Sequence, residues 1–176
     1  MAVPPRITTG NRLRDARRAQ RRDDVITDQG DTDFGQLIDI ELIKRLRYRY
    51  MRHLDHGEAS AVASCFVDDA TASFGGGRNF SSSAEIAAFV AERAGLRRSL
   101  HTAHQPEIDV DGESASGTWA IQVTSFAADG SSSNSASLYH DEYVKTNDGW
   151  RIRSIRRQLL FDHRTALLGH ASDLGR

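Results

Sequence analysis

Residues 113–130, "ESASGTWAIQVTSFAADG", alternate between apolar and polar side chains. A period of two places the apolar side chains on one face of an extended strand; they are Ala115, Trp119, Ile121 and Val123. Such alternation is typical of a half-buried strand in an antiparallel sheet. The segment therefore predicts that the C-terminal half of the chain is built from β-strands.

The segments on either side of this strand show the same alternation. "SLHTAHQPEIDVDG" (99–112) precedes it and ends in an Asp-Gly turn. "SASLYHDEYVKTNDG" (135–149) and "GWRIRSIRRQLLFD" (149–162) follow it and meet at an Asn-Asp-Gly turn. Turn residues between alternating segments are typical of β-hairpins. The sequence therefore predicts a meander of long antiparallel strands.

Upstream of the strands, apolar residues recur at steps of three and four, which is typical of an amphipathic helix. They are Leu37, Ile40, Ile43, Leu46, Tyr50 and Leu54, and Gly57 follows as a stop signal. Further helices are predicted in 58–66 and 82–95, with a turn at 68–69 and a short strand in 70–77 between them. Helices followed by antiparallel strands indicate an α+β fold, with helices on one face of a curved sheet and a pocket for a small molecule.

Length and composition limit the possible functions. The chain has 176 residues and a net charge of −1, which is enough for one domain and gives no general attraction to nucleic acid or anionic membranes. We predict a flexible polar N-terminal extension over 1–35, a folded domain over 36–162 and a C-terminal tail over 163–176. Because Cys65 is the single cysteine and no signal peptide or membrane-spanning run is visible, a cytoplasmic protein is expected.

Asp55 stands at an unfavourable position, because the C-terminal end of the first predicted helix is its negative end. A carboxylate there costs roughly 0.3–1 kcal/mol. Asp55 is either solvated in the turn-like "LDHGE" (54–58) or turned into a cavity, where it accepts a hydrogen bond. Tyr50 lies on the apolar stripe of the same helix, either as a core tyrosine or with its hydroxyl directed at a substrate.

Three histidines could take part in proton transfer in such a cavity. His101 and His104 share the first long strand, and His140 lies in a later one. Pro106 is expected to force a β-bulge, so that alternation cannot decide which of His101 and His104 points inward. No tight metal-ligand motif is present, and we expect neither a metal nor another cofactor.

The order of these elements, with several of the residues in it, resembles the SnoaL-like branch of the nuclear transport factor 2-like superfamily. The resemblance is carried by "IKRLRYRYMRHLDHGEASAVASCFVDDA" (43–70), "HTAHQPEIDVDGESASGTW" (101–119) and "YHDEYVKTNDGWRIRS" (139–154). It implies a cone-shaped barrel, in which a strongly curved, mainly antiparallel sheet is wrapped by three N-terminal helices around a deep, mostly apolar cavity.

Within that family, Tyr50-x4-Asp55 together with His101 resembles scytalone dehydratase, bile-acid dehydratase and hexachlorocyclohexane dehydrochlorinase. In those enzymes a His–Asp pair is the general base of an elimination without a cofactor. The resemblance therefore implies that His101 removes a proton, that Asp55 orients it, and that Tyr50 stabilises the developing charge. An arginine of the last strand is implied as well; Arg156 shares the parity of the apolar side chains there, and Arg153 is the alternative.

The expected function is that of a cofactor-independent lyase or isomerase acting on a small, largely apolar cyclic substrate, such as a steroid or polyketide. The alternative is a non-catalytic binding or assembly module, similar to the small subunit of ring-hydroxylating dioxygenases, whose partner is a catalytic large subunit. A homo-oligomer, a dimer or a trimer, is also expected, because three helices cannot cover both faces of the strand that carries Trp119, Ile121 and Val123.

Overall fold

The computed structural model describes residues 34–165. Most of the predicted extension over 1–35 and of the predicted tail over 163–176 therefore lies outside the described residues. Regular structure extends slightly beyond the predicted domain of 36–162 at both ends, because the first described helix begins at Phe34 and the last strand ends at Thr165.

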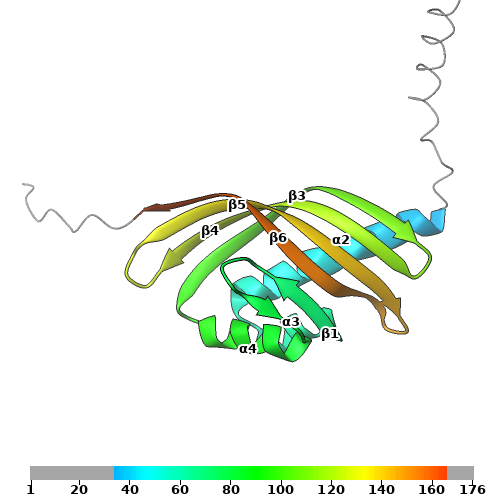
Figure 1. The fold of residues 1–176 in the computed structure, drawn as a ribbon, viewed down its shortest axis with the longest axis horizontal. Helices are drawn as coiled ribbons and strands as arrows, with labels where there is room; N and C mark the ends of the chain where they lie inside the picture. Colours follow the sequence, from blue (N-terminus) through cyan, green and yellow to red (C-terminus); the bar gives the residue numbers. More distant parts are fainter. Residues whose placement is uncertain (1–33, 166–176) are drawn as a thin grey trace, which may run out of the picture. The chain divides into compact units, whose positions relative to one another are not determined.

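Helices lead the described chain, and the long strands follow, as predicted for an α+β fold (Figure 1). The elements are α2 (Phe34–His56), α3 (Ala59–Ala63), β1 (Phe66–Ser73), β2 (Asn79–Phe80), α4 (Ser83–Arg93), β3 (Arg97–Asp111), β4 (Ser114–Ala127), β5 (Ser132–Thr146) and β6 (Gly149–Thr165). The strands form one six-stranded sheet in the order β2-β1-β6-β5-β4-β3. Only the β1–β6 pair is parallel within this sheet, so that it is mixed but mostly antiparallel, and β3 to β6 form the predicted meander.

The predicted turn at Asp68 and Asp69 is wrong. Both residues are exposed and lie inside β1, where the pairing with β6 shifts register between Phe66 and Thr71. Aspartate is unfavourable in a strand, but the tertiary pairing of β1 decides its conformation here. The segment after β1 contains the short strand β2.

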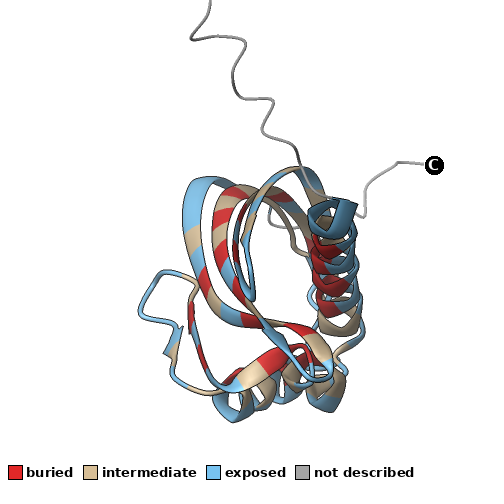
Figure 2. Ribbon diagram, turned by 90° about the vertical axis from the view of Figure 1, so that its right-hand side faces the viewer, coloured by how far each residue is buried: buried red, intermediate tan, exposed pale blue. Residues whose placement is uncertain are grey.

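The buried stripe of α2 packs against the sheet. Ile43 and Leu46 belong to one core cluster with Trp119 and Ile121 of β4, and Figure 2 shows the buried residues of α2 facing the strands. Trp119 is fully buried and Ile121 is 2% exposed. These side chains therefore face the core of the protein itself, which removes the sequence-based reason for an oligomer; the homo-oligomer stays a prediction.

Helix α4 begins with a hydrogen-bonded cap. Ser82 Oγ accepts a hydrogen bond from the Glu85 backbone N at 3.2 Å, and Glu85 Oε2 accepts one from the Ser81 backbone N at 2.7 Å. This reciprocal pattern satisfies two backbone donors and holds the start of the helix. Ile86 and Val90 are buried on the same helix face. The cap thus fixes where α4 begins, and with it which of the following side chains face the pocket described below.

Asp39 ties α2 to the ends of β5 and β6 that flank the turn between them. Its carboxylate accepts hydrogen bonds from Trp150 Nε1 at 2.9 Å and from Lys145 Nζ at 3.0 Å. The hydrogen bond from Lys145, followed by that from Trp150, lowers the pKa of Asp39 below its ordinary value of 3.8. Because the pKa is lower in the folded state, this stabilisation is complete above about pH 4 and is lost as the pH falls through the lowered pKa.

We therefore expect Asp39→Asn to lower the free energy of unfolding by about 1–2 kcal/mol at neutral pH, because the charge-assisted bond to Lys145 is lost. The difference from the wild type should shrink as the pH falls below about 4. Urea unfolding at the two pH values measures both effects. Asp148→Asn, at an exposed position in the same turn, is the control and should change the stability by less than about 0.5 kcal/mol. A difference that persists in acid would contradict the role of the charge.

Candidate active site

Asp55 and His101 come from two elements far apart in the chain. Asp55 lies in the last turn of α2, which ends one residue later, and Gly57 leaves the helix with a φ of +70°. Space at this turn is limited, because a Cβ on Gly57 would lie 3.1 Å from the Cβ of Ala94. His101 lies near the start of β3. The end of α2 is thus held against the start of β3, and the two side chains meet.

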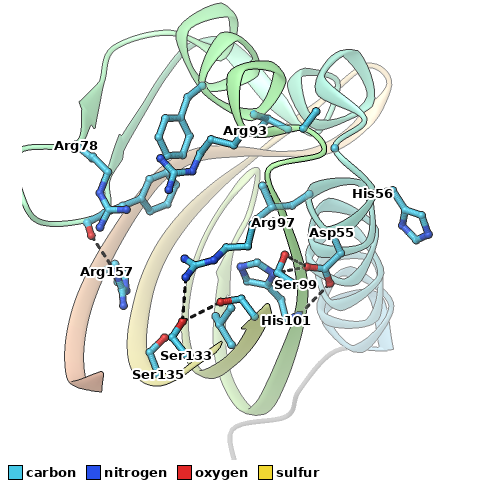
Figure 3. Close-up of a pocket in the computed structure, with 18 of the residues that line it drawn as sticks. Asp55, His56, Arg78, Arg93, Arg97, Ser99, His101, Ser133, Ser135 and Arg157 are labelled. Carbon is cyan, nitrogen blue, oxygen red and sulfur yellow. Dashed lines mark hydrogen bonds and ion pairs between the residues drawn. The ribbon is translucent and has the colours of Figure 1, made fainter. Parts of the chain in front are cut away.

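The Asp55 carboxylate receives three interactions from β3 (Figure 3). His101 Nδ1 lies 2.5 Å from Oδ1, and the His101 backbone N donates to Oδ2 at 2.9 Å. Ser99 Oγ donates to Oδ1 at 2.8 Å. The side chains of His101 and Asp55 are 15% and 12% exposed. With its Nδ1 proton directed at Asp55, the imidazole leaves Nε2 to accept a proton.

The charge of Asp55 follows from these contacts. Burial acts to raise its pKa, but the hydrogen bonds from the side chain and the backbone of His101 and from Ser99 outweigh burial, so that the pKa of Asp55 lies below its ordinary value of 3.8. Asp55 is therefore a carboxylate at neutral pH. Charge-assisted hydrogen bonds of this kind contribute roughly 1.5–3 kcal/mol, more than the penalty at the negative end of the helix.

Tyr50 lines the same pocket as the Asp55–His101 pair. Its residue is 3% exposed, and its ring meets that of Phe66 edge to face at a centroid distance of 5.2 Å. Burial raises the pKa of Tyr50, so that the hydroxyl stays protonated. Among the described residues no hydrogen-bond partner of this hydroxyl is found, and it is available as a donor to a ligand.

The pocket has a volume of about 270 Å³. Its apolar wall is formed by α2, α4, β4 and the first residue after β1, with Leu54, Phe74, Ile86, Phe89, Val90 and Val123. The rest of the lining is polar and includes Ser99, Ser125, Ser133, Ser135 and five arginines, Arg78, Arg93, Arg97, Arg157 and Arg164. The resemblance implies a mostly apolar cavity; this lining combines an apolar wall with a positively charged one.

The β3 bulge lies after both His101 and His104, so that these two residues, three positions apart in a regularly paired part of the strand, face opposite sides of the sheet. The pairing of β3 with β4 shifts register between His104 and Glu107, and Gln105 in between has a φ of +46°. His104 is exposed, and only His101 of the two lines the pocket. His140 lies in a second pocket, where its Nδ1 is 3.4 Å from Thr118 Oγ1.

Arg156, predicted from strand parity, is not part of the pocket of His101. It is exposed and lines the second pocket, and its alternative Arg153 is exposed as well. The pairing of β5 with β6 shifts register opposite Arg153, which changes the alternation between the buried Ile152 and Ile155. As a result Arg157, one residue later, takes the inward position.

Arg157 is held in place by uncharged acceptors. Its Nε donates to Ser137 Oγ at 2.8 Å, and its Nη1 donates to the carbonyl of Phe74 at 3.3 Å.

Ser99 was not predicted as a site residue from the sequence. It lies two residues before His101, so that both side chains share one face of β3, and this spacing is the signal that would have found it.

A metal would need several ligands close together. Among residues 34–165, no group of three or more His, Cys, Asp or Glu side chains is placed to hold a metal ion. Within the same range, no helix has the length and apolar character needed to cross a membrane. The Asp55–His101 pair and Tyr50 are among the described groups that can move a proton in this pocket, which His56, Tyr139 and Asp162 also line.

Comparison with known proteins relates the chain to one family. Residues 35–156 match the family described as the SnoaL-like domain. A protein of unknown function from Mycobacterium tuberculosis, Rv3472, is 26% identical, with a TM-score of 0.67 over 74% of this chain and 78% of that one.

Two similar structures carry the names of lyases. A candidate scytalone dehydratase from Novosphingobium aromaticivorans is 17% identical, with a TM-score of 0.68 over 77% of this chain and 96% of that one. A type 3 hexachlorocyclohexane dehydrochlorinase from Novosphingobium barchaimii is 16% identical, with a TM-score of 0.67 over 76% and 94%. At these identities the likeness shows a shared fold, and lyases are thus among the distant structural relatives of the chain.

Proposed function

The chain belongs to the SnoaL-like family of the nuclear transport factor 2-like superfamily, and we propose that it is a cofactor-independent lyase or isomerase acting on a small cyclic substrate. The observation that supports this proposal is the Asp55–His101 pair, a charged carboxylate bound to an imidazole at the wall of a pocket. A carboxylate that fixes the tautomer of an imidazole and stabilises its protonated form is a recurrent general-base arrangement.

In this reaction His101 Nε2 takes a proton from a carbon next to a carbonyl group. The electron pair of the broken C–H bond moves into the ring and places negative charge on the carbonyl oxygen. Asp55 stabilises the imidazolium that forms, and the Tyr50 hydroxyl donates a hydrogen bond to the charged oxygen. Loss of a leaving group from the neighbouring carbon, as an anion or as water with the proton from His101, then completes an elimination. In a β,γ-unsaturated ketone, return of the proton to the γ-carbon instead completes an isomerisation.

The substrate class follows from the size and the wall of the pocket. About 270 Å³ suits a small ring compound. Leu54, Phe89 and Val90 would hold the faces of the ring while its acidic C–H bond points at His101. Burial of the ring against these side chains excludes water from the base, which strengthens the electrostatic stabilisation of the charged oxygen.

Exchange of solvent deuterium into 2-tetralone tests the proposed proton transfer without knowledge of the natural leaving group. This bicyclic ketone has acidic hydrogens next to its carbonyl, and NMR follows their loss in D₂O. We expect the protein to accelerate the exchange over buffer at neutral pH, with no effect of EDTA. His104→Ala should keep the wild-type rate, because His104 is exposed and outside the pocket. Exchange at the buffer rate would contradict the proposal and favour the non-catalytic binding module.

A further inference from the structure

The pocket carries a positive charge that the proton transfer does not use. We call Arg78, Arg93 and Arg157 the arginine cluster; they come from the turn before β2, the end of α4 and β6. Figure 3 shows Arg78 and Arg157 on the side of the pocket opposite Asp55. Three separate elements thus bring guanidinium groups to one wall.

Among residues 34–165, the arginine cluster lacks compensating carboxylates. The described part of the pocket lining contains two acidic side chains: Asp55, which is bound by His101, and Asp162, whose Oδ2 accepts from Arg164 Nη2 at 3.0 Å. Among the described residues, no ion pair is formed by the three arginines of the cluster. Their charge is therefore available to a ligand.

Uncharged groups hold the cluster in the pocket. Arg78 Nε donates to the Gly75 carbonyl at 3.2 Å, and the guanidinium carbon of Arg93 lies 4.9 Å from the ring centroid of Phe89. Burial, followed by the positive charges of Arg157 and Arg93, lowers the pKa of Arg78. The three charges thus repel one another, and an anion placed between them would relieve that repulsion.

We propose that the substrate carries an oxyanion group, a carboxylate or a phosphate, and that the arginine cluster binds it. The planar fork of a guanidinium matches both groups with paired hydrogen bonds. Arg78 and Arg93 are exposed, so that they also attract the anion from solution, whereas Arg157 is half-buried. The statement that the bound molecule is a substrate rests on the proposed function; the anion site itself does not.

Binding at this wall would also orient the molecule. The negative charge of Asp55 repels an anion from the other side of the pocket, which favours the orientation with the anion at the cluster. The ring then lies between the cluster and His101, against Phe89 and Val90. The arginine cluster would therefore select which ring carbon faces the base.

Three matched naphthalene probes test the anion site by calorimetry at low salt: 2-naphthoate, 2-naphthyl phosphate and the neutral 2-naphthamide. We expect at least one of the two anions to bind about tenfold or more tightly than the amide, and the tighter anion identifies the group. Two variants, Arg157→Gln and Arg78→Gln, should each weaken anion binding about three- to tenfold or more. Arg78 is exposed, so that its replacement does not endanger folding. Arg156→Gln is the matched control, one residue away and outside this pocket, and should bind like the wild type.

Equal binding of all three probes, or binding of none, would overturn the proposal, as would wild-type anion binding by Arg157→Gln and Arg78→Gln. The two assays separate the two ideas. Exchange into 2-tetralone without a preference for anionic probes would leave the lyase or isomerase standing and remove the anion site. Arginine-dependent anion binding without exchange would keep the anion site and remove the proposed chemistry.

Discussion

His101→Ala is expected to lower the protein-catalysed exchange of deuterium into 2-tetralone by about 10²–10⁴-fold, because the group that takes the proton is lost. The fold should be retained, since the His101 backbone N can still donate to Asp55. NMR measures the exchange, and circular dichroism checks the fold. Wild-type exchange in His101→Ala would remove the mechanism.

Changes at the two other groups should give a graded series on the same ketone. Asp55→Asn keeps an acceptor for Ser99 and His101 but removes the charge that stabilises the imidazolium, and we expect a loss of about 10²–10⁴-fold. Tyr50→Phe removes one hydrogen bond to the charged oxygen, at most about 2–4 kcal/mol.

The lowered pKa of Asp55 limits which group can explain a loss of exchange as the pH falls. The carboxylate is already charged at every pH above its ordinary value of 3.8. A loss of exchange between about pH 8 and pH 5 would therefore not reflect protonation of Asp55.

The helical part of the fold was predictable because one period governs it. Ile43, Leu46 and Tyr50 follow steps of three and four, and the structure places all three on the buried stripe of α2. Arg47 lies on the same stripe and is 1% exposed. A charged residue at a position in the apolar stripe indicates a buried ion pair. The position of Arg47 in the stripe could therefore have predicted this pair from the sequence.

The strand faces were harder to predict, because each bulge reverses the alternation after it. Pro106 indicated the bulge in β3, although not the face of His101, which came from the family resemblance. No residue type marked the bulge at Arg153 in β6, so that parity led to Arg156 and the structure turns Arg157 inward. The arginine cluster could not be read from the sequence at all, because its members meet only through contacts between distant elements.

Asp141→Ala is expected to destabilise the protein by about 3–5 kcal/mol, because it leaves a buried charge on Arg47 without its partner. Arg47 Nη1 lies 2.8 Å from Asp141 Oδ2, and the two side chains are 1% and 0% exposed. The Tyr143 hydroxyl donates to the same oxygen at 2.8 Å and accepts from Trp119 Nε1 at 2.9 Å. Urea unfolding followed by tryptophan fluorescence measures the loss.

The double variant Arg47→Met/Asp141→Leu separates the value of the pair from the cost of breaking it. Within the described part of the chain, buried Arg47 Nε and Asp141 Oδ1 have no hydrogen-bond partner, so that the pair satisfies only part of its polar groups there. Replacement of both by apolar side chains of similar length should therefore recover most of the stability lost in Asp141→Ala. Glu142→Ala, exposed at the neighbouring position, is the control; it removes the hydrogen bond from Ser154 Oγ and should cost about 1 kcal/mol or less.

The Arg47–Asp141 pair also borders the candidate site, which gives the double variant a second readout. The guanidinium carbon of Arg47 lies 5.2 Å from the ring centroid of Tyr50 and 4.9 Å from that of Tyr139, and both tyrosines line the pocket. A stable double variant that loses exchange into 2-tetralone would show that Arg47 holds Tyr50 in position for the substrate. A double variant as unstable as Asp141→Ala would instead show that the pair stabilises the fold more than apolar packing can replace.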